Sequence, residues 1–255
     1  MKPAPRRTVR VFPDRASLDE CMFGEWCAAA KRAIRRSGRF AAALSGGLAP
    51  VPFYERLADG GRDLPWEDTH VFLADERFVP KDDPDSNFGM IERTLLRRVP
   101  VPRGNLHTVP VRLKPEAAAE GYERSIRRFF GLKPGGAPRF DLVLLGIGEE
   151  GHTASLFPGD PAMKESRRLA VAVARPAREH DRVTLTLPAI NAARLIAFLV
   201  SGPDKAEALK ASVEERPGGP PASLVRPRRG RIVFLADEGS ARLLAPTPPA
   251  SEAAA

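Results

Sequence analysis

Cysteine, aromatic side chains and long apolar runs are all scarce in this chain of 255 residues. The two cysteines, Cys21 and Cys27, are six residues apart in a predicted helix, so they share no face and lack the spacing of a metal site. No apolar run approaches the length of a membrane span, and the basic N-terminus has no apolar signal core. We therefore expect a cytoplasmic protein with no membrane partner.

Two catalytic motifs are also missing. The chain has no G-x-x-x-x-G-K-[ST] phosphate loop, so nucleotide hydrolysis is unsupported. It has no glycine-flanked serine elbow either, which argues against a covalent serine hydrolase.

Positive charge is in excess, with 40 Lys and Arg against 32 Asp and Glu and a formal net charge of +8. This excess favours acidic partners, such as a small phosphorylated substrate. A nucleic-acid-binding protein would also need a basic stripe interleaved with aromatic residues. The arginines instead occur as scattered doublets, which is typical of solvated helix faces, so we expect no nucleic-acid partner.

Short aliphatic segments alternate with longer amphipathic ones along the chain, and 43% of the residues are hydrophobic. The alternation predicts an α/β fold: a mostly parallel, doubly wound sheet with helices on both faces, in a single domain over residues 9–244. Residues 1–8 and 245–255 are expected to be disordered tails. The predicted strands are 40–44, 70–74, 142–146, 195–200 and 232–236, with weaker candidates at 171–174 and 183–187. The predicted helices are 17–37, where Ser17 and Glu20 have capping-box spacing, 50–58, 86–96, 115–130 and 204–212.

Ligands of such sheets bind beyond the carboxyl ends of the strands, so the loops there are the candidate site. The first of these loops contains Ser45, Gly46 and Gly47 and leads into a helix. Glycines allow a ligand to approach the backbone closely, and the first N–H groups of a helix are unpaired at its positive end. This arrangement binds phosphate, although a plain tight turn has the same sequence features.

The second loop has charged side chains at the end of predicted strand 70–74. Asp75 could hold a sugar hydroxyl or orient a base, and Arg77 offers a planar fork of donors to an anion. Asn87 follows a short distance along the chain. The alternative is a surface ion pair beside a proline turn.

The third loop follows the strongly apolar strand 142–146 and carries His152. Histidine is the side chain suited to proton transfer near neutral pH. Gly148 and Gly151 free the backbone to direct N–H groups at a developing oxyanion, and Glu150 could orient the His152 ring. The alternative is a structural histidine after a glycine-rich turn.

The segments LSGGLAP, FLADERFVPKDDPDSNFGMI, FDLVLLGIGEEGHTASLFPG, RVTLTLPAINAAR and FLVSGPDKAEAL occur in this order. Together they resemble the signature segments of 6-phosphogluconolactonases, and the resemblance spans residues 9–244. It implies hydrolysis of 6-phospho-D-glucono-1,5-lactone in the pentose phosphate pathway, without a metal or an organic cofactor. The substrate would be this small phosphorylated sugar lactone, and the protein a monomer or a homodimer.

The resemblance also implies roles for particular residues. His152 matches the catalytic histidine of the family. The positions matching its phosphate-binding and polar site residues are Ser45, Gly46, Gly47, Asp75, Arg77, Asn87 and Lys205, and Arg182 is expected to face the pocket. The sequence departs from the family at Leu48 and Ala49, where a hydroxyl residue and threonine are usual, and at Glu150, where aspartate is usual.

Two other functions stay open from the sequence. A glucosamine-6-phosphate deaminase has a similar D-G-H segment, but the continuation from Thr153 to Pro158 favours the lactonase. A sugar-phosphate-binding protein with weakened catalysis would explain Leu48, Ala49 and Glu150, but it does not explain the retention of His152.

Overall fold

A computed structural model of the chain describes residues 6–176, 179–214 and 218–245. Its centre is a seven-stranded sheet in the order β1-β10-β9-β6-β2-β3-β5, in which every neighbouring pair is parallel. The strands are β1 (Arg6–Phe12), β2 (Phe40–Leu44), β3 (Thr69–Leu73), β5 (Leu106–His107), β6 (Leu142–Leu145), β9 (Leu195–Val200) and β10 (Arg231–Asp237). The parallel sheet predicted from the aliphatic segments is confirmed.

A second sheet of three antiparallel strands lies beside the first. It consists of β4 (Asp75–Arg77), β8 (Arg182–Leu185) and β7 (Ala170–Val173), in the order β4-β8-β7. Asp75 and Arg77 therefore belong to a short strand and not to the loop we expected. Strand β4 was missed because three polar residues carry no apolar alternation.

The N-terminal boundary of the domain also differs from the expectation. Arg6, Arg7 and Thr8, placed in the basic tail 1–8, form the first part of β1 and pair in parallel with β10. Their charges hid an edge strand from the search for apolar runs. Residues 1–5 and 246–255 of the two expected tails lie outside the described residues.

Helices connect the strands, close to the positions predicted. They are α1 (Arg15–Ser37), α2 (Val51–Gly60), α3 (Asn87–Ile91), α4 (Pro115–Phe130), α5 (Leu187–Ile190), α6 (Ala206–Val213) and α7 (Glu238–Ala241). A π-helical turn, Glu92–Leu96, continues α3, and short 3-10 turns lie at Trp66–Asp68, Arg103–Asn105, Pro161–Lys164, Pro203–Lys205 and Pro221–Leu224. Asp14, and not the predicted Ser17, caps α1: its side chain accepts the Ser17 N–H at 2.7 Å, so the helix begins two residues early.

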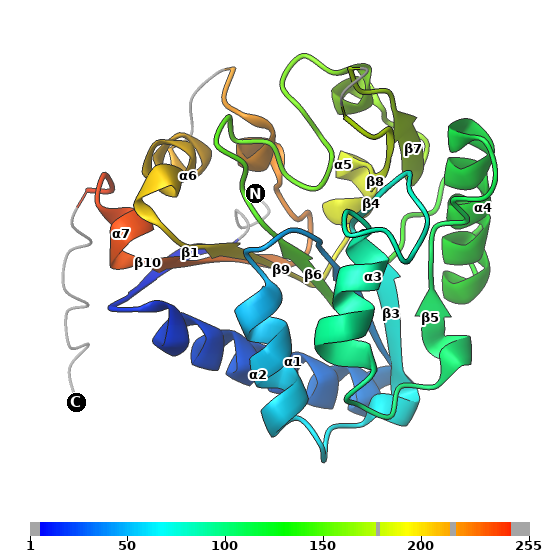
Figure 1. Ribbon diagram of the computed structural model, residues 1–255, viewed down its shortest axis with the longest axis horizontal. Coiled ribbons are helices and arrows are strands. Elements are labelled where there is room, and N and C mark those ends of the chain that lie inside the picture. The colour runs from blue at the N-terminus through cyan, green and yellow to red at the C-terminus, as the bar shows by residue number, and fades with distance from the viewer. Residues whose placement is uncertain (1–5, 177–178, 215–217, 246–255) are drawn as a thin grey trace.

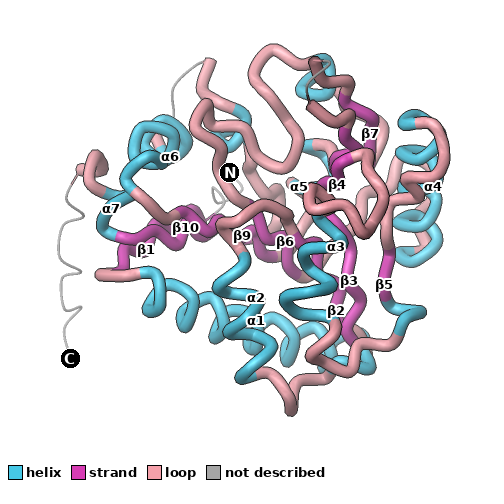
Figure 2. The backbone as a smooth tube through the Cα atoms, viewed as in Figure 1, coloured by secondary structure: helices cyan, strands magenta, loops and turns pink. Residues whose placement is uncertain are grey.

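The helices cover both faces of the larger sheet. In Figure 1, α1 and α2 lie on one side of it and α6 and α7 on the other. Figure 2 shows the same arrangement, with long loops above the carboxyl ends of β6 and β9. Strands β2, β6 and β9 are buried along their whole length, as strands covered on both faces must be. Among the described residues, no helix combines the length and apolarity needed to cross a membrane.

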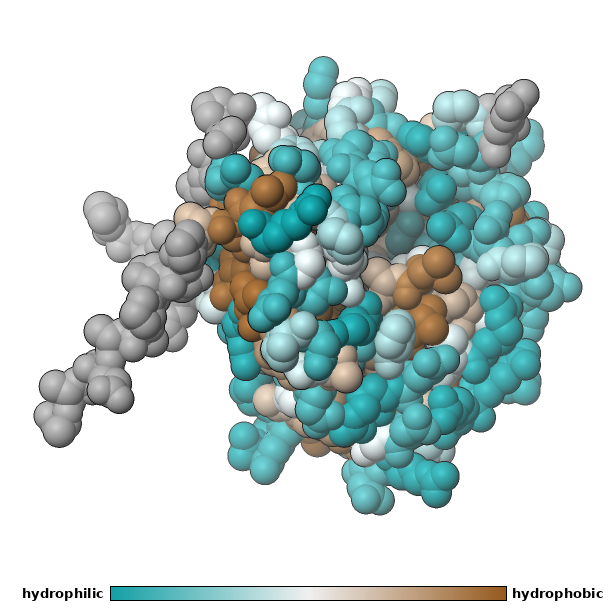
Figure 3. Space-filling view, turned by 60° about the vertical axis from the view of Figure 1, so that its left-hand side comes forward, coloured by the Kyte–Doolittle hydropathy of each residue, from teal (hydrophilic) through white to brown (hydrophobic). Residues whose placement is uncertain are grey.

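The surface is largely polar. Figure 3 shows a mostly hydrophilic face interrupted by separate hydrophobic patches. Four large hydrophobic side chains among the described residues are strongly exposed: Val11, Leu48, Leu113 and Leu224. Leu48, at 88% exposure, is the most exposed of them, and it belongs to the first candidate loop.

Candidate active site

A cavity of about 510 Å³ lies at the carboxyl ends of β2, β6 and β9, beside β4 and β8. Its walls include ten of the candidate residues: Ser45, Gly46, Gly47, Asp75, Arg77, Asn87, Gly148, His152, Arg182 and Lys205. These residues come from six separate elements and loops of the chain. The position at the strand ends is the one that a parallel sheet predicts for its ligand.

The first candidate loop follows β2, and two hydrogen bonds of Ser45 fix its position. The Ser45 hydroxyl donates to the Leu144 carbonyl at 2.7 Å, and the Tyr54 hydroxyl donates to the Ser45 carbonyl at 2.7 Å. The N–H groups of Gly46 and Gly47 donate no hydrogen bond within the described residues. They are therefore available to an anion in the cavity, ahead of α2.

Gly46 allows the close approach of a second segment. A Cβ atom at this position would lie 1.8 Å from Oδ1 of Asn87, so any larger residue would displace the Asn87 side chain. Asn87 itself is buried, and its Nδ2 donates to the Asp75 carbonyl at 2.9 Å. Its Oδ1 has no hydrogen-bond partner among the described residues. A buried, unpaired carbonyl oxygen on the cavity wall is an acceptor suited to a substrate hydroxyl.

A network of buried carboxylates holds the end of β4. Oδ2 of Asp75 accepts the Ser155 hydroxyl at 2.7 Å, which ties β4 to the loop of His152. Glu76 points the other way and accepts the N–H groups of Asn87 at 2.7 Å and Phe88 at 2.8 Å. Burial raises the pKa of Glu76 to about 7, against the lowering effect of these backbone N–H groups.

Four cations line the cavity, and three of them, Arg77, Arg182 and Lys205, were candidate residues. Arg77 and Arg182 occupy paired positions of β4 and β8, and Lys205 precedes α6. Burial lowers the pKa of Arg182, and the charge of Arg77 lowers it further. Two arginines held this close repel each other, and an anion between them would relieve that repulsion. Lys205 Nζ lies 3.0 Å from Asp204 Oδ2 and 3.8 Å from Glu149 Oε1, so its charge is partly paired already.

The His152 ring is packed tightly on the cavity wall. A Cβ atom on Gly148 would lie 2.0 Å from Cε1 of His152, so this glycine makes room for the ring. The ring also lies 4.6 Å from the ring of Phe157. The N–H groups of Gly148 and Gly151 are both used inside the loop, donating to the carbonyls of His152 and Gly148 at 2.9 Å. Their own N–H groups are therefore not available to a developing oxyanion.

Glu150 stands beside the histidine, at the edge of the site. Its Oε1 is 3.1 Å from Nδ1 of His152, but the approach lacks hydrogen-bond geometry, and Nδ1 is buried without a partner among the described residues. The distance supports an electrostatic contact, not a directed hydrogen bond. Partial burial acts to raise the pKa of Glu150, but its own N–H and the charge of His152 outweigh this, and the net change is downward.

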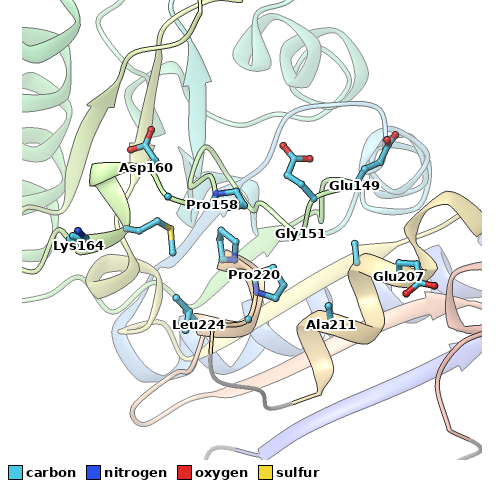
Figure 4. A pocket seen from close by; sticks show the side chains of 16 residues that line it. Glu149, Gly151, Pro158, Asp160, Lys164, Glu207, Ala211, Pro220 and Leu224 are labelled. Atoms are coloured by element: carbon cyan, nitrogen blue, oxygen red, sulfur yellow. The ribbon is translucent and has the colours of Figure 1, made fainter.

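Glu150 and Gly151 line a neighbouring hollow of about 690 Å³ and not the cavity of His152. Figure 4 shows that hollow, with Gly151 and Pro158 on one side and Glu207 and Ala211 of α6 with Pro220 on the other. Gly151 has a φ of +77°, and a Cβ atom there would lie 2.4 Å from Cβ of Pro220. Its role is therefore to pack the loop of His152 against the segment that contains Pro220.

Several cavity residues were missed from the sequence. Arg15 reaches the cavity from the start of α1, donating to the Ala49 carbonyl at 2.5 Å and to Asp19 at 2.7 and 2.8 Å. Ala154 has a φ of +48° in the loop of His152, which is unusual for a residue with a side chain. Neither feature has a local sequence signal. Among the described residues, no three His, Cys, Asp or Glu side chains form a group that could hold a metal ion.

Known proteins resemble the chain over most of its length. Residues 13–234 match the family model of glucosamine-6-phosphate isomerases/6-phosphogluconolactonase. A 6-phosphogluconolactonase of Synechocystis is 41% identical over 218 residues, covering 84% of this chain and 89% of that protein. The human GDH/6PGL endoplasmic bifunctional protein is 42% identical over 215 residues, which are 82% of this chain but 27% of that protein.

A solved structure agrees with these likenesses. The crystal structure of 6-phosphogluconolactonase from Thermotoga maritima superposes with a TM-score of 0.79 at 31% identity, covering 91% of this chain and 100% of that one. The match of sequence, fold and site segments leads to one conclusion: the chain belongs to the family of glucosamine-6-phosphate isomerases and 6-phosphogluconolactonases.

Proposed function

We propose that this protein hydrolyses 6-phospho-D-glucono-1,5-lactone to 6-phospho-D-gluconate, a step of the pentose phosphate pathway. The observation that carries the proposal is one cavity lined by His152, by Arg77, Arg182 and Lys205, and by the free N–H groups of the loop after β2. Relatives about 41% identical over most of the chain are named as 6-phosphogluconolactonases, which supports the same substrate.

The cations select the substrate by its phosphate. Arg77 and Arg182 supply planar donor groups, and the loop after β2 adds the N–H groups of Gly46 and Gly47. Holding the phosphate at one end of the cavity places the lactone carbonyl near His152 at the other. The unpaired Oδ1 of Asn87 is suited to accept a hydroxyl of the sugar.

His152 then acts as the general base. Because Nδ1 lies beside Glu150, Nε2 is the nitrogen left to take a proton from the attacking water. The water oxygen bonds to C1, and the electron pair of the C=O bond moves to the carbonyl oxygen as the tetrahedral intermediate forms. When the ring C–O bond breaks, the imidazolium returns its proton to the leaving oxygen. A δ-lactone needs no covalent nucleophile for this reaction.

Replacing His152 tests the mechanism. We expect His152→Ala to lower kcat by about 10²–10⁴-fold, the usual contribution of a general base, while the protein stays folded. A rapid lactonase assay against the spontaneous hydrolysis of the substrate gives the rate, and circular dichroism checks the fold. Full activity in His152→Ala would show that another group accepts the proton.

Assays with two substrates, the phosphorylated lactone and glucosamine 6-phosphate, separate the other functions. A deaminase would release ammonia from glucosamine 6-phosphate, and a binding protein would turn over neither substrate. We expect turnover of the phosphorylated lactone alone, by a cytoplasmic enzyme that is a monomer or a homodimer.

A further inference from the structure

Arginine side chains gather at the end of the larger sheet opposite the cavity of His152. Arg32 and Arg36 come from α1, which runs along one face of the sheet in Figure 1. Arg194 immediately precedes β9, and Arg231 opens β10. These four residues, called here the arginine cluster, line a small cavity of about 110 Å³ together with Ala29, Asp141 and Leu195.

The carboxylate of Asp141, which lines this cavity, already has partners for both of its oxygens. Oδ1 of Asp141 contacts both Arg36 and Arg194, the latter at 3.3 Å from its Nε. Oδ2 of Asp141 accepts the N–H of Ala41 at 3.0 Å. One aspartate with both oxygens engaged therefore faces four guanidinium groups.

The neighbouring charges do not restore the balance. Glu25 makes a two-pronged contact with Arg231, and Nη1 of Arg10 lies 3.8 Å from the same carboxylate. Including Arg10, five guanidinium groups surround two carboxylates, which leaves three positive charges in excess. Like charges this close repel one another, and an anion between them would relieve that repulsion.

Two members of the arginine cluster have unused donors. The side chain of Arg32 makes no ion pair or hydrogen bond among the described residues. The Nε–H of Arg194 is buried, and its contact with Asp141 lacks hydrogen-bond geometry. Burial lowers the pKa of Arg194, and the charges of Arg36 and Arg139 lower it further. A buried donor without an acceptor, such as the Nε–H of Arg194, is rare in folded proteins, and a bound ion is one explanation for it.

The small cavity continues into a wider groove. A hollow of about 520 Å³ shares Arg32 and Arg231 with it and is also lined by Arg10, Cys21, Gly24, Glu25 and Ala28. Gly24, with no side chain, leaves open space on α1 at this point. A phosphate group in the small cavity would leave room in the groove for the rest of a larger molecule.

We propose that the arginine cluster is a second anion site, which binds the phosphate of a small phosphorylated molecule at the end of the sheet opposite the lactone cavity. Guanidinium groups bind phosphate oxygens through paired N–H donors, and four of them converge on this cavity. The proposal does not rest on the lactonase function, because none of these residues lines the cavity of His152.

Calorimetric titration with inorganic pyrophosphate, at constant ionic strength, tests the proposal. The full chain with Arg182→Ala is used, so that binding in the cavity of His152 is weakened. We expect one pyrophosphate per chain, and at least tenfold weaker binding when Arg32→Glu is added. Arg32 suits the test because it is exposed and unpaired among the described residues, so the variant should fold.

Arg128→Glu is the matched control, since Arg128 is an exposed arginine on α4 and the change in net charge is the same. We expect this variant to bind pyrophosphate within twofold of its parent. Equal weakening by Arg32→Glu and Arg128→Glu would mean that only net charge matters, and the proposal would fall. It would also fall if the Arg182→Ala protein bound no pyrophosphate. ADP in place of pyrophosphate should bind at least as well if the groove accepts the larger molecule.

Discussion

At the scale of single residues, the question is what orients the His152 ring in the cavity. The glycine-rich loop was predicted to carry a proton-transfer histidine, and His152 does line the cavity beside the cations. Glu150, predicted to orient it, is half exposed and makes only an electrostatic contact. The ring is held instead by packing, against Gly148 and Phe157. We therefore infer that van der Waals contacts, more than a hydrogen bond, set the ring orientation.

Glu76 carries the clearest pH dependence among the residues of the site region. Its pKa is raised to about 7 in the folded protein, above the value of about 4.5 that an exposed glutamate has. The folded state therefore binds a proton more tightly than the unfolded state. The contribution of protonated Glu76 to the free energy of unfolding is fully present below about pH 4.5 and is lost as the pH rises through about 7. This loss is on the order of 3 kcal/mol.

The substitution Glu76→Gln tests this link, because glutamine cannot ionise. We expect the free energy of unfolding of the variant, relative to the wild type, to improve by on the order of 2 kcal/mol between pH 5 and pH 8. Urea unfolding at several pH values measures it. Glu55→Gln, at an exposed position of α2, is the control and should run parallel to the wild type. Parallel curves for Glu76→Gln as well would contradict the raised pKa.

At the scale of elements, the loop after β2 shows how a phosphate site can work without its usual hydroxyl groups. Leu48 points to solvent, and Ala49 lies on the cavity wall with its carbonyl held by Arg15. The free N–H groups of Gly46 and Gly47 and the cations of β4 and β8 remain as donors. The missing hydroxyls are thus expected to weaken phosphate binding without abolishing it.

Restoring one hydroxyl should strengthen binding. We expect Ala49→Thr to lower KM for the phosphorylated lactone by about 2–10-fold, since a neutral hydrogen bond contributes about 0.5–1.5 kcal/mol. Ala49→Val has the same shape without the hydroxyl and is the control. Steady-state kinetics of both variants decide the matter: an equal KM for the threonine and valine variants would mean that the added oxygen makes no bond to the phosphate.

At the scale of the whole molecule, the sheet depends on a strand that the sequence hid. Strand β1 closes one edge of the sheet by pairing with β10. Val9 lies opposite Phe234 and packs against the core, while its neighbour Thr8 is exposed. The strand therefore contributes an inward face in addition to its backbone hydrogen bonds.

A charge on that inward face should lower the stability of the whole domain. We expect Val9→Asp to reduce the free energy of unfolding by about 1–3 kcal/mol, because it brings a carboxylate against the apolar core. Thr8→Asp, on the exposed face, should change it by less than about 0.5 kcal/mol. Chemical denaturation of the two variants makes the comparison. Similar losses in both would indicate that β1 contributes by its backbone alone.

The sequence by itself determined the buried strands, the longer helices and the loops that form the cavity. Aliphatic runs such as 40–44 and 195–200 are buried on both faces, so their composition identifies them without tertiary knowledge. Glycine and charged residues directly after these strands indicated the candidate loops, because this signal also lies within a few residues of the chain. The polar strand β4 and the charged start of β1 were not visible, because pairing with a neighbouring strand makes these residues part of a sheet.

Only the tertiary structure decided which side chains meet. It brought Arg15 and Ser155 to the site, placed Glu150 and Gly151 in the neighbouring hollow, and assembled the arginine cluster from α1 and two strand ends that are far apart in the chain. Such contacts join residues far apart in the chain, and they depend on packing between elements. No local pattern encodes that packing, because composition and spacing act over a few residues while the site spans the width of the sheet.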